Sequence, residues 1–399
     1  MCEARGRPLR DSAFPVGAPS AVSLNEVAPT MMRPTPWTGE QVTKIVDRVD
    51  SCAKRITAAD VVSVAQNLVV WDAWPVQHPN GYPFSVEPGH ELWMALATPR
   101  HEDPDERHNQ ARIHLLLRGE GAWLDLGPAM PDDFSPGSRE WSGSAVVNQD
   151  ESTITLYFTA SGRRGEQELS FEQRIFSAQA TIEGRLPRPR LVDWRNLRET
   201  FVLDPVHYMS TVGGLGEIGK IKAFRDPAFF RDPAAGSDYL FFAGSQAGSE
   251  SDYNGVVGAV VADQSASTGW RLLPPIVTAD GLNNELERPH VVHHKDLYYL
   301  FWSTQRHVFN PTGPTGPTGL YGMVSKNVLG GWKPLNGSGL VLANPAEAPA
   351  QTFSWLVLPD LSVTSFIDDW EGGSARSFGG TFAPFLHLEL DGDRSAVRP

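Results

Sequence analysis

The feature that most limits the possible folds is a weak repeat of aromatic-rich segments with the residue types of β-strands. The five copies, which start roughly 60 to 85 residues apart, are LWMALA (92–97), ITLYFTA (154–160), YLFFAG (239–244), LYYLFWS (297–303) and VTSFID (363–368). Each of the last four follows a polar turn, and another short apolar strand precedes that turn: SAVV, PAFF, PHVV and WLVL. A repeated unit of this size predicts an all-β fold, a β-propeller of five blades. A β-sandwich with irregularly spaced hairpins is the alternative.

Composition narrows the function classes. Lys and Arg total 34 against 47 Asp and Glu, a net charge of −13, and no basic run offsets it. Such a surface repels phosphate backbones, so we expect no nucleic-acid partner. No run of 18 apolar residues is present, so we expect no membrane span. The 12 Trp and 19 Phe suit a β-rich core and equally suit stacking on sugars.

The N-terminal region differs in composition from the rest of the chain. Residues 1–35 are rich in Pro, Ala, Ser and Arg, and contain no apolar run typical of an ordinary signal peptide. We expect residues 1–35 to be a mobile arm and residues 36–399 to form one catalytic domain. The two cysteines, Cys2 and Cys52, leave the redox compartment undetermined.

The tripeptide Arg-Asp-Pro occurs twice within ten residues, at 225–227 and 231–233. The second copy precedes Ala-Ala-Gly-Ser-Asp at the hairpin turn of its unit, where Asp and Pro are common for conformational reasons. The first copy starts an inner strand, and the inner strands of a propeller line its central channel. We therefore predict that Arg225 and Asp226 act in a pocket, and that the second copy only forms a turn.

Two other strand units carry polar residues at the same place. In VVWDAWPVQ (69–77), Asp72 interrupts an apolar segment, which is a costly position for a carboxylate without a partner or a function. In REWSGS (139–144), Trp141 offers a surface for stacking and Ser142 a hydrogen-bonding group. Both stretches are therefore candidates for the same pocket.

A pair of glutamates starts a further unit, NNELERPHVV (283–292). In an extended strand Glu285 and Glu287 point to the same face, and Pro289 favours that geometry at Arg288. Two neighbouring like charges raise one pKa, which keeps a carboxylic acid protonated near neutral pH. Together with Asp72 and Asp226, these groups suit a retaining glycoside-processing enzyme. The alternative is that each carboxylate only pairs with a nearby Arg.

Three stretches that match functional patterns are interpreted here as non-functional. Residues 214–219, GLGEIG, match a dinucleotide-binding pattern, but Arg225 follows too closely for the required helix. We interpret them as a glycine-rich loop. The loop HEDPDERH (101–108) and the pair His293–His294 could ligate a metal, but they lack complementary ligands, so solvated turns are the preferred interpretation.

At these residues the sequence resembles a known family. The motifs VVWDAWPVQ, EWSGS, FRDPAFF, ELERPHVV, YGMVS, GSGLVLANP, QTFSW and VTSFID occur in the order found in levansucrases, inulosucrases and related bacterial β-fructosyltransferases. The resemblance covers residues from about 36 to about 395. It implies a single five-bladed propeller with a funnel-shaped pocket, acting on sucrose and sugar acceptors. It also implies an extracellular location.

The resemblance further implies roles for individual residues. Asp72 would be the nucleophile, Asp226 the transition-state stabiliser and Glu287 the acid/base. The residues that would hold the fructosyl unit or the catalytic groups are Trp71, Trp141, Ser142, Arg225 and Glu285. Arg225 would keep Asp226 ionised. Retaining chemistry by two carboxylates needs neither a cofactor nor a metal ion, so we expect none.

The sequence departs from the family pattern beside the catalytic trio. Phe353 and Trp355 stand in QTFSW where many members have QTYSH, Gln305 replaces an Arg or His near the acceptor, and Ala243 replaces a Glu. Because polar partners for an acceptor are lost, we expect hydrolysis and short transfer products, with Trp355 available for stacking on a sugar. The alternatives are an invertase-like or arabinan-cleaving hydrolase, and a sugar-binding propeller without catalysis.

Overall fold

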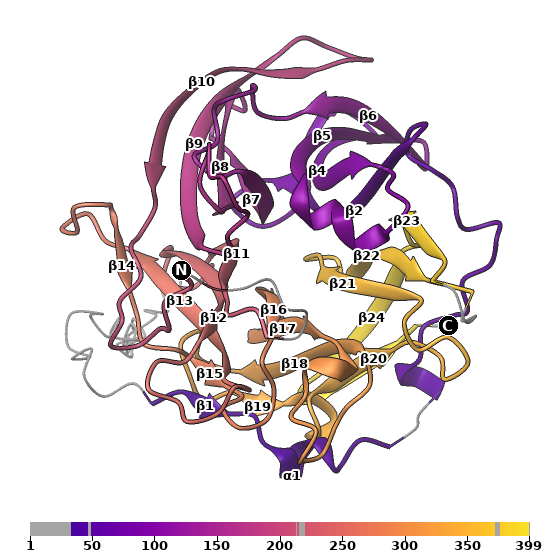
Figure 1. Cartoon of the computed structure of the whole chain (residues 1–399), viewed down its shortest axis with the longest axis vertical. Coiled ribbons are helices and arrows are strands. Elements are labelled where there is room, and N and C mark those ends of the chain that lie inside the picture. Colours follow the sequence, from indigo (N-terminus) through magenta and orange to yellow (C-terminus); the bar gives the residue numbers. More distant parts are fainter. Residues whose placement is uncertain (1–32, 47–48, 213, 215–219, 372–375, 399) are drawn as a thin grey trace, which may run out of the picture. The chain divides into compact units, whose positions relative to one another are not determined.

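The computed structural model describes residues 33–46, 49–212, 214, 220–371 and 376–398. Within them the chain forms five antiparallel groups of strands, the blades, whose innermost strands surround a common axis (Figure 1). The five-bladed propeller predicted from the repeat is confirmed, and the sandwich alternative is wrong.

Each blade begins at the axis with an inner strand and adds strands outward. The inner strands are β2 (Leu68–Gln77), β7 (Arg139–Val147), β11 (Phe224–Arg231), β16 (Glu287–His294) and β21 (Thr352–Val357). The second strands, which contain the five segments of the sequence repeat, are β4 (His90–Pro99), β8 (Thr153–Ser161), β12 (Asp238–Ser245), β17 (Leu297–Thr304) and β22 (Ser362–Asp369). The repeat therefore marks the same strand of every blade.

The outer strands vary more in length and pairing. The third strands are β5 (Arg112–Gly119), β9 (Gln173–Glu183), β13 (Gly255–Ala262) and β18 (Gly319–Ser325), while β22 pairs with both β23 (Phe378–Phe382) and β24 (Leu386–Asp391). The edges are formed by β3 (Ser85–Glu87), β6 (Ala122–Pro128), β10 (Arg190–Glu199), β14 (Trp270–Leu272), β15 (Val277–Thr278), β19 (Lys333–Pro334), β20 (Leu340–Ala343) and β25 (Arg394–Val397). Most of these edge strands are only two to four residues long, which limits edge-to-edge pairing with other chains, although β10 has ten residues.

The second strands explain why aromatic residues carry the repeat. In β17, Leu300, Phe301 and Trp302 are all fully buried, because both faces of the strand pack against neighbouring blades or strands. A strand covered on both faces reads as a continuous apolar run rather than an alternating one. Large flat side chains fill the space between sheets and contribute most of the buried apolar area.

The inner strands contact one another in the ring order β2, β7, β11, β16, β21 and back to β2. The first two blades are also joined by parallel pairing of β2 with β7, at Val76 with Ala145 and Gln77 with Val146. The ring therefore holds five inner strands at fixed positions around one axis.

A break in strand pairing occurs in every inner strand. The register shifts between Trp71 and Trp74, Trp141 and Gly143, Arg225 and Ala228, Glu287 and His290, and Phe353 and Leu356. Four non-glycine residues at these breaks have positive φ angles: Asp72 (51°), Asp226 (62°), Arg288 (48°) and Ser354 (60°). Such bulges redirect side chains, and left-handed backbone at non-glycine residues is typical of functional sites.

Short elements complete the fold. Strand β1 (Thr35–Pro36) pairs in parallel with β15, so Thr35 already belongs to the sheet. The helices are α1 (Gly39–Val42) and the 3₁₀ turns η2 (Val49–Ser51), η3 (Pro104–Asn109), η4 (Arg306–Val308) and η5 (Leu335–Gly337). None of the helices in the described part of the chain is long and apolar enough to cross a membrane.

Two sequence predictions fall largely on residues without a description. Residues 1–32, most of the expected N-terminal arm, lie outside the described residues. The same is true of residues 215–219 in the GLGEIG stretch, so the interpretation of that stretch as a glycine-rich loop stays a prediction.

Candidate active site

The inner strands surround a cavity of about 570 Å³. Every site residue predicted from the sequence lines it: Trp71, Asp72, Trp141, Ser142, Arg225, Asp226, Glu285, Glu287 and Gln305. Their segments lie up to 234 residues apart in the chain, and the bulges bring them to one end of the axis. The structure thus brings the whole predicted set together.

Asp72 lies at the bulge of β2 and faces the next blade. Its Oδ2 accepts a 2.8 Å hydrogen bond from the hydroxyl of Ser142, which is itself buried on β7. This bond holds one carboxylate oxygen in place, which sets the direction of the other. A carboxylate fixed in this way is oriented for attack on a bound sugar.

Asp226 is held on three sides at the bulge of β11. Its backbone N–H donates a 2.9 Å hydrogen bond to Thr159 Oγ1. Its Oδ2 accepts a 3.3 Å hydrogen bond from the backbone N–H of Arg288. The Nε of Arg225 lies 3.5 Å from the same oxygen. Only 7% of Asp226 is exposed, so its carboxylate is fixed and poorly hydrated.

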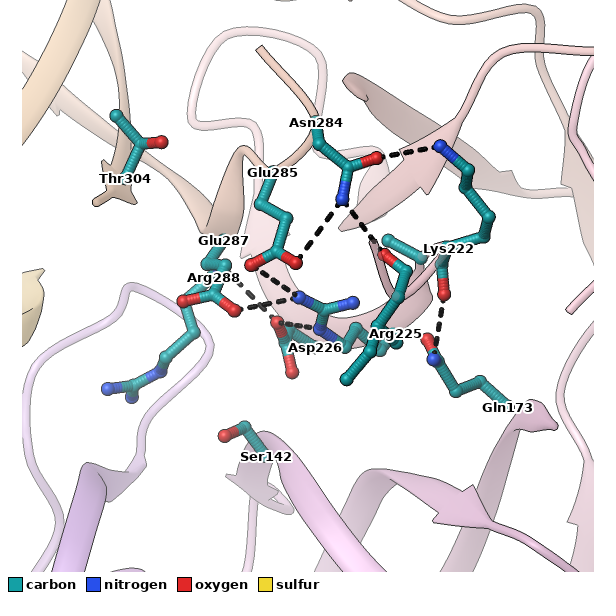
Figure 2. Close-up of polar contacts among 12 residues, drawn as sticks. Ser142, Gln173, Lys222, Arg225, Asp226, Asn284, Glu285, Glu287, Arg288 and Thr304 are labelled. Carbon is teal, nitrogen blue, oxygen red and sulfur yellow. Dashed lines mark hydrogen bonds and ion pairs between the residues drawn. The ribbon is translucent and has the colours of Figure 1, made fainter. Parts of the chain in front are cut away.

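Arg225 is the centre of the carboxylate cluster (Figure 2). Its Nη2 donates a 2.7 Å hydrogen bond to Glu287 Oε1 and lies 3.5 Å from Glu285 Oε2. Asn284 donates to the other oxygen of Glu285 at 3.3 Å. Among the described residues, Arg225 Nη1 has no hydrogen-bond partner although it is buried, which leaves a donor for a ligand.

Burial and crowding raise the pKa of two of these carboxyls. The pKa of Asp226 is raised to about 7 by burial and by the charges of Glu287 and Asp72, although Arg225 and Arg288 oppose the shift. Arg225 favours the ionised form of Asp226, as expected, but burial outweighs the guanidinium, so the net shift of the pKa is upward. Positive charge that develops on a bound sugar would favour the ionised form again.

The pKa of Glu285 is raised to about 8 by burial and then by Glu287, which also shares a hydrogen bond with it. The sequence predicted that one of these two neighbouring glutamates stays protonated near neutral pH. The upward shift of the Glu285 pKa agrees with that prediction. The raised pKa favours the protonated form of Glu285, which shares a hydrogen bond with Glu287. The pair therefore keeps one acidic proton at the cavity.

A pH-dependent stability difference follows from this raised pKa. A carboxyl with a raised folded-state pKa stabilises the fold below its unfolded pKa, near 4.5, and this contribution is lost as pH rises through about 8. Glu285→Gln cannot titrate, so we expect it to raise the free energy of unfolding at pH 8 by on the order of 3 kcal/mol, and by much less at pH 5. Urea unfolding at both pH values measures this. Glu389→Gln, at an exposed pair with Arg398, is the control and should show no such difference; an equal effect of Glu285→Gln at both pH values would contradict the prediction.

The structure adds site residues that sequence reasoning missed. Arg288 is buried and donates to Ala73 O at 2.7 Å and to Ser354 Oγ at 2.9 Å, so it joins the first, fourth and fifth blades at the cavity wall. Thr159, on β8, orients Asp226. Arg288 and Ser354 occupy the bulge positions that correspond to Asp72 and Asp226, a correspondence that appears only once the strands are paired.

The 101–108 loop is only in part the solvated turn that the sequence predicted: Glu102, Asp103 and Glu106 are exposed, but Arg107 is not. Its η3 turn lines the cavity, and Arg107 is only 6% exposed. Burial, followed by the charge of Arg107, lowers the pKa of His108 well below its usual value. Arg107 is buried because its guanidinium lies over Trp71 and Phe378, with its Cζ 5.7 Å and 4.7 Å from the ring centroids.

The acceptor-side predictions have mixed outcomes. Gln305 and Phe353 line the cavity as expected. Trp355 does not line it and is 1% exposed, so the expectation that it stacks on a sugar is wrong. Residues two apart in a regular strand share a face, but the bulge between Phe353 and Leu356 breaks that pattern, and Trp355 packs edge-on against Phe353 inside the blade. Ala243 is fully buried opposite Arg225 in the sheet.

The candidate metal ligands do not form a site in the described residues. His293 and His294 lie at the end of β16, where their rings contact Tyr298 and Tyr299. Nowhere among the described residues does a group of three or more His, Cys, Asp or Glu side chains lie where it could hold a metal ion. The carboxylate cluster is instead balanced by Arg225 and Arg288.

Comparison with known proteins agrees with the fold and this geometry. The family described as levansucrase/invertase matches residues 27–259 and 249–399. The chain belongs to this family. Its membership favours a glycoside-processing enzyme over a sugar-binding propeller without catalysis.

Individual relatives match over nearly their whole length. The levansucrase LscC of Pseudomonas savastanoi pv. glycinea is 31% identical, over 92% of this chain and 91% of the relative. The levansucrase of Rahnella aquatilis is 30% identical, over 91% and 94%. Among solved structures, the inulosucrase of Halalkalicoccus jeotgali, bound to kestose, is 32% identical with a TM-score of 0.83, over 92% of this chain and 95% of that one. Family members of both names therefore share the architecture of this chain.

Proposed function

We propose that the protein cleaves sucrose through a covalent fructosyl-enzyme and passes the fructosyl group to water or to a sugar acceptor. One observation carries this proposal: Arg225 contacts Asp226, Glu285 and Glu287 on the floor of a cavity that also contains Asp72. A nucleophilic carboxylate and a second carboxyl that can supply a proton are the groups that a retaining glycosidase needs, and Asp226 adds a third carboxyl beside them. Similarity to an inulosucrase bound to kestose supports a fructoside as the ligand.

In the first step an oxygen of Asp72 attacks the anomeric carbon of the fructosyl unit. The bond from that carbon to the glycosidic oxygen breaks, the electron pair stays on the oxygen, and Glu287 supplies its proton, so glucose leaves. Asp226 opposes the positive charge that develops on the ring. In the second step Glu287 takes a proton from water or from a sugar hydroxyl, whose oxygen attacks the same carbon and releases Asp72. Two inversions give net retention.

Three buried donors are available to bind the fructosyl unit. Trp71 Nε1, Trp141 Nε1 and Arg225 Nη1 have no hydrogen-bond partner among the described residues, and all three residues line the cavity. Buried donors are rarely left unsatisfied, so sugar hydroxyls are suitable acceptors. This supports binding roles for Trp71, Trp141 and Arg225, while Ser142 and Glu285 orient Asp72 and Glu287.

Glucose release from sucrose by the purified protein tests the proposed function. We expect release by the wild type and none by Asp72→Asn. An arabinan-cleaving enzyme of the same architecture would release arabinose from arabinan and no glucose from sucrose, which would contradict the proposal. An invertase-like enzyme would release glucose and fructose in equal amounts at every sucrose concentration, with no transfer products.

We further propose that hydrolysis and short transfer products dominate. Phe353 lines the cavity in place of a Tyr hydroxyl, Gln305 lines it in place of an Arg or His that could make a stronger, charge-assisted hydrogen bond to an acceptor, and Trp355 is too buried to compensate. Each missing hydrogen bond costs roughly 0.5–1.5 kcal/mol, so two reduce acceptor occupancy by roughly one to two powers of ten. The double variant Gln305→His plus Phe353→Tyr should raise the transfer ratio at high sucrose. Long fructan from the wild type, or an unchanged ratio in the variant, would refute this.

Neither step requires a metal ion. We therefore expect exhaustive chelation to leave sucrose turnover and melting temperature unchanged, because the carboxylate cluster is neutralised by arginines and retained protons. Turnover and thermal unfolding before and after chelation measure this. A large fall in either, restored by adding back a divalent cation, would show that the prediction is wrong.

A further inference from the structure

A lysine lies next to the carboxylate cluster but outside the cavity lining. Lys222 is half-buried, just before β11 and three residues before Arg225. Its ammonium group donates to Asn254 Oδ1 and Asn284 Oδ1, both at 2.9 Å, and to the backbone oxygen of Asp252. An ammonium group has three protons, so each of them has an acceptor. The group thereby joins the segments that lead into β11, β13 and β16.

The charge of Lys222 is connected with the site. All three of its acceptors are neutral carbonyl or amide oxygens. Burial lowers the pKa of Lys222, whereas the charges of Asp252 and Glu285 raise it. Lys222 and Glu285 therefore act on each other electrostatically across Asn284, which hydrogen-bonds with both (Figure 2).

The ammonium group decides which way the Asn284 amide faces. An amide has an acceptor end and a donor end, and an ammonium group can only donate. Because Asn284 Oδ1 accepts from Lys222, its Nδ2 faces the other side, where it donates to Glu285 Oε1 at 3.3 Å and to Ile221 O at 3.1 Å. Lys222 thus directs the donor end of Asn284 onto Glu285.

Glu285 passes this orientation on to the catalytic acid. While its Oε1 accepts from Asn284, its Oε2 lies 3.5 Å from Arg225 Nη2. The same nitrogen of Arg225 donates to Glu287 Oε1 at 2.7 Å. A continuous series of contacts therefore leads from Lys222 to the carboxyl that would protonate the leaving oxygen.

The backbone of Lys222 is fixed as well. Gln173, a buried residue of β9, donates from Nε2 to Lys222 O at 2.8 Å and accepts at Oε1 from the Phe224 N–H at 2.9 Å. These two bonds hold the segment that leads into Arg225. Since both the backbone and the side chain of Lys222 are held, the ammonium group has a fixed position relative to the carboxylate cluster.

We propose that Lys222 is a positioning residue for proton donation, which holds Glu285 through Asn284 and thereby keeps Glu287 in the geometry that protonates the leaving oxygen. This inference rests on the proposed function. A general acid is effective only when it lies within hydrogen-bond reach of the atom that it protonates. A small displacement of Glu287 therefore slows the steps that need its proton.

The experiment compares two fructosyl donors that differ in their need for a proton. Glucose must be protonated to leave sucrose, whereas nitrophenolate leaves nitrophenyl β-D-fructofuranoside with little protonation. For Lys222→Met, which removes all three hydrogen-bond donors, we expect kcat/KM on sucrose to fall about tenfold or more. On the nitrophenyl fructoside it should change less than about threefold. Lys222→Gln, with a shorter side chain and no charge, should show a selective loss on sucrose as well.

A double variant tests the route through Asn284. If Lys222 acts through this amide, adding Lys222→Met to Asn284→Leu should lower kcat/KM on sucrose by less than about twofold beyond Asn284→Leu alone. Additive losses would mean that the two residues act independently, and would overturn the inference. Melting temperatures of all variants monitor folding.

The matched control is Lys295→Met. The Lys295 ammonium group also donates to a backbone oxygen of another blade, Leu390 O at 3.4 Å, but it lies outside the cavity lining, so the variant should change neither donor. If the Lys222 variants lost activity equally on both donors, or lost none on sucrose, the inference would be overturned and Lys222 would be a structural link between blades. Failure of the wild type to cleave sucrose would instead refute the proposed function.

Discussion

Replacing Asp72 with Asn, or Glu287 with Gln, is expected to lower sucrose turnover by roughly three powers of ten or more without altering the fold. Asn cannot form the covalent fructosyl-enzyme, and Gln can neither donate the proton to the leaving oxygen nor accept one from water. Both changes preserve shape, and Ser142 and Arg225 can still hydrogen-bond the new side chains. Turnover, with circular dichroism and melting temperature as controls for folding, measures this.

A donor with a good leaving group separates the two roles. Nitrophenyl β-D-fructofuranoside needs little protonation, so Glu287→Ala should still form the fructosyl-enzyme from it while Asp72→Ala should not. Added azide should then give β-fructosyl azide with Glu287→Ala, by attack on the intermediate, and α-fructosyl azide with Asp72→Ala, by direct displacement. The opposite pairing of products, or a tenth of wild-type turnover in either variant, would reverse or remove the role assignment.

The blades could be predicted from sequence because their second strands are covered on both faces. Segments such as LYYLFWS must be continuously apolar and aromatic to fill the space between sheets, so they repeat visibly along the chain. The inner strands are less regular, since each carries a bulge whose position depends on pairing with its neighbour. Register is a property of two strands together, so one strand's sequence does not determine it.

The same limit explains which site residues were found. Asp72 and Asp226 stand out because a carboxylate in an apolar strand is costly. Arg288 and Ser354 stand at equivalent bulges, but their neighbours in sequence are ordinary, and only the spatial contact between them shows their role. The contribution of the η3 turn to the site was missed for a related reason. A charged loop is expected to be solvated unless the side chain that covers it is known, and Arg107 is covered by Phe378, about 270 residues later in the chain.

The two Arg-Asp-Pro copies should differ sharply when their aspartates are changed in the same way. Asp226→Asn is expected to lower kcat by roughly a hundredfold or more with little change in KM, because its charge matters chiefly when positive charge develops on the ring. Asp232→Asn should keep kcat within about twofold, since Asp232 lies outside the cavity lining, at the turn after β11.

Asp232 nevertheless has a structural role that its turn position did not reveal. It is only 4% exposed, and it accepts hydrogen bonds from Tyr298 Oη of the next blade at 2.7 Å and from the Ala234 N–H at 2.9 Å. Asn keeps an oxygen that can accept both bonds, whereas Asp232→Ala leaves the buried Tyr298 hydroxyl without this partner and should cost about 1–3 kcal/mol of stability. Steady-state kinetics and urea unfolding therefore give opposite patterns. Asp226→Asn loses rate and keeps stability, and Asp232→Ala loses stability and keeps rate. Equal kinetic damage from Asp226→Asn and Asp232→Asn would show that the pocket-versus-turn distinction is wrong.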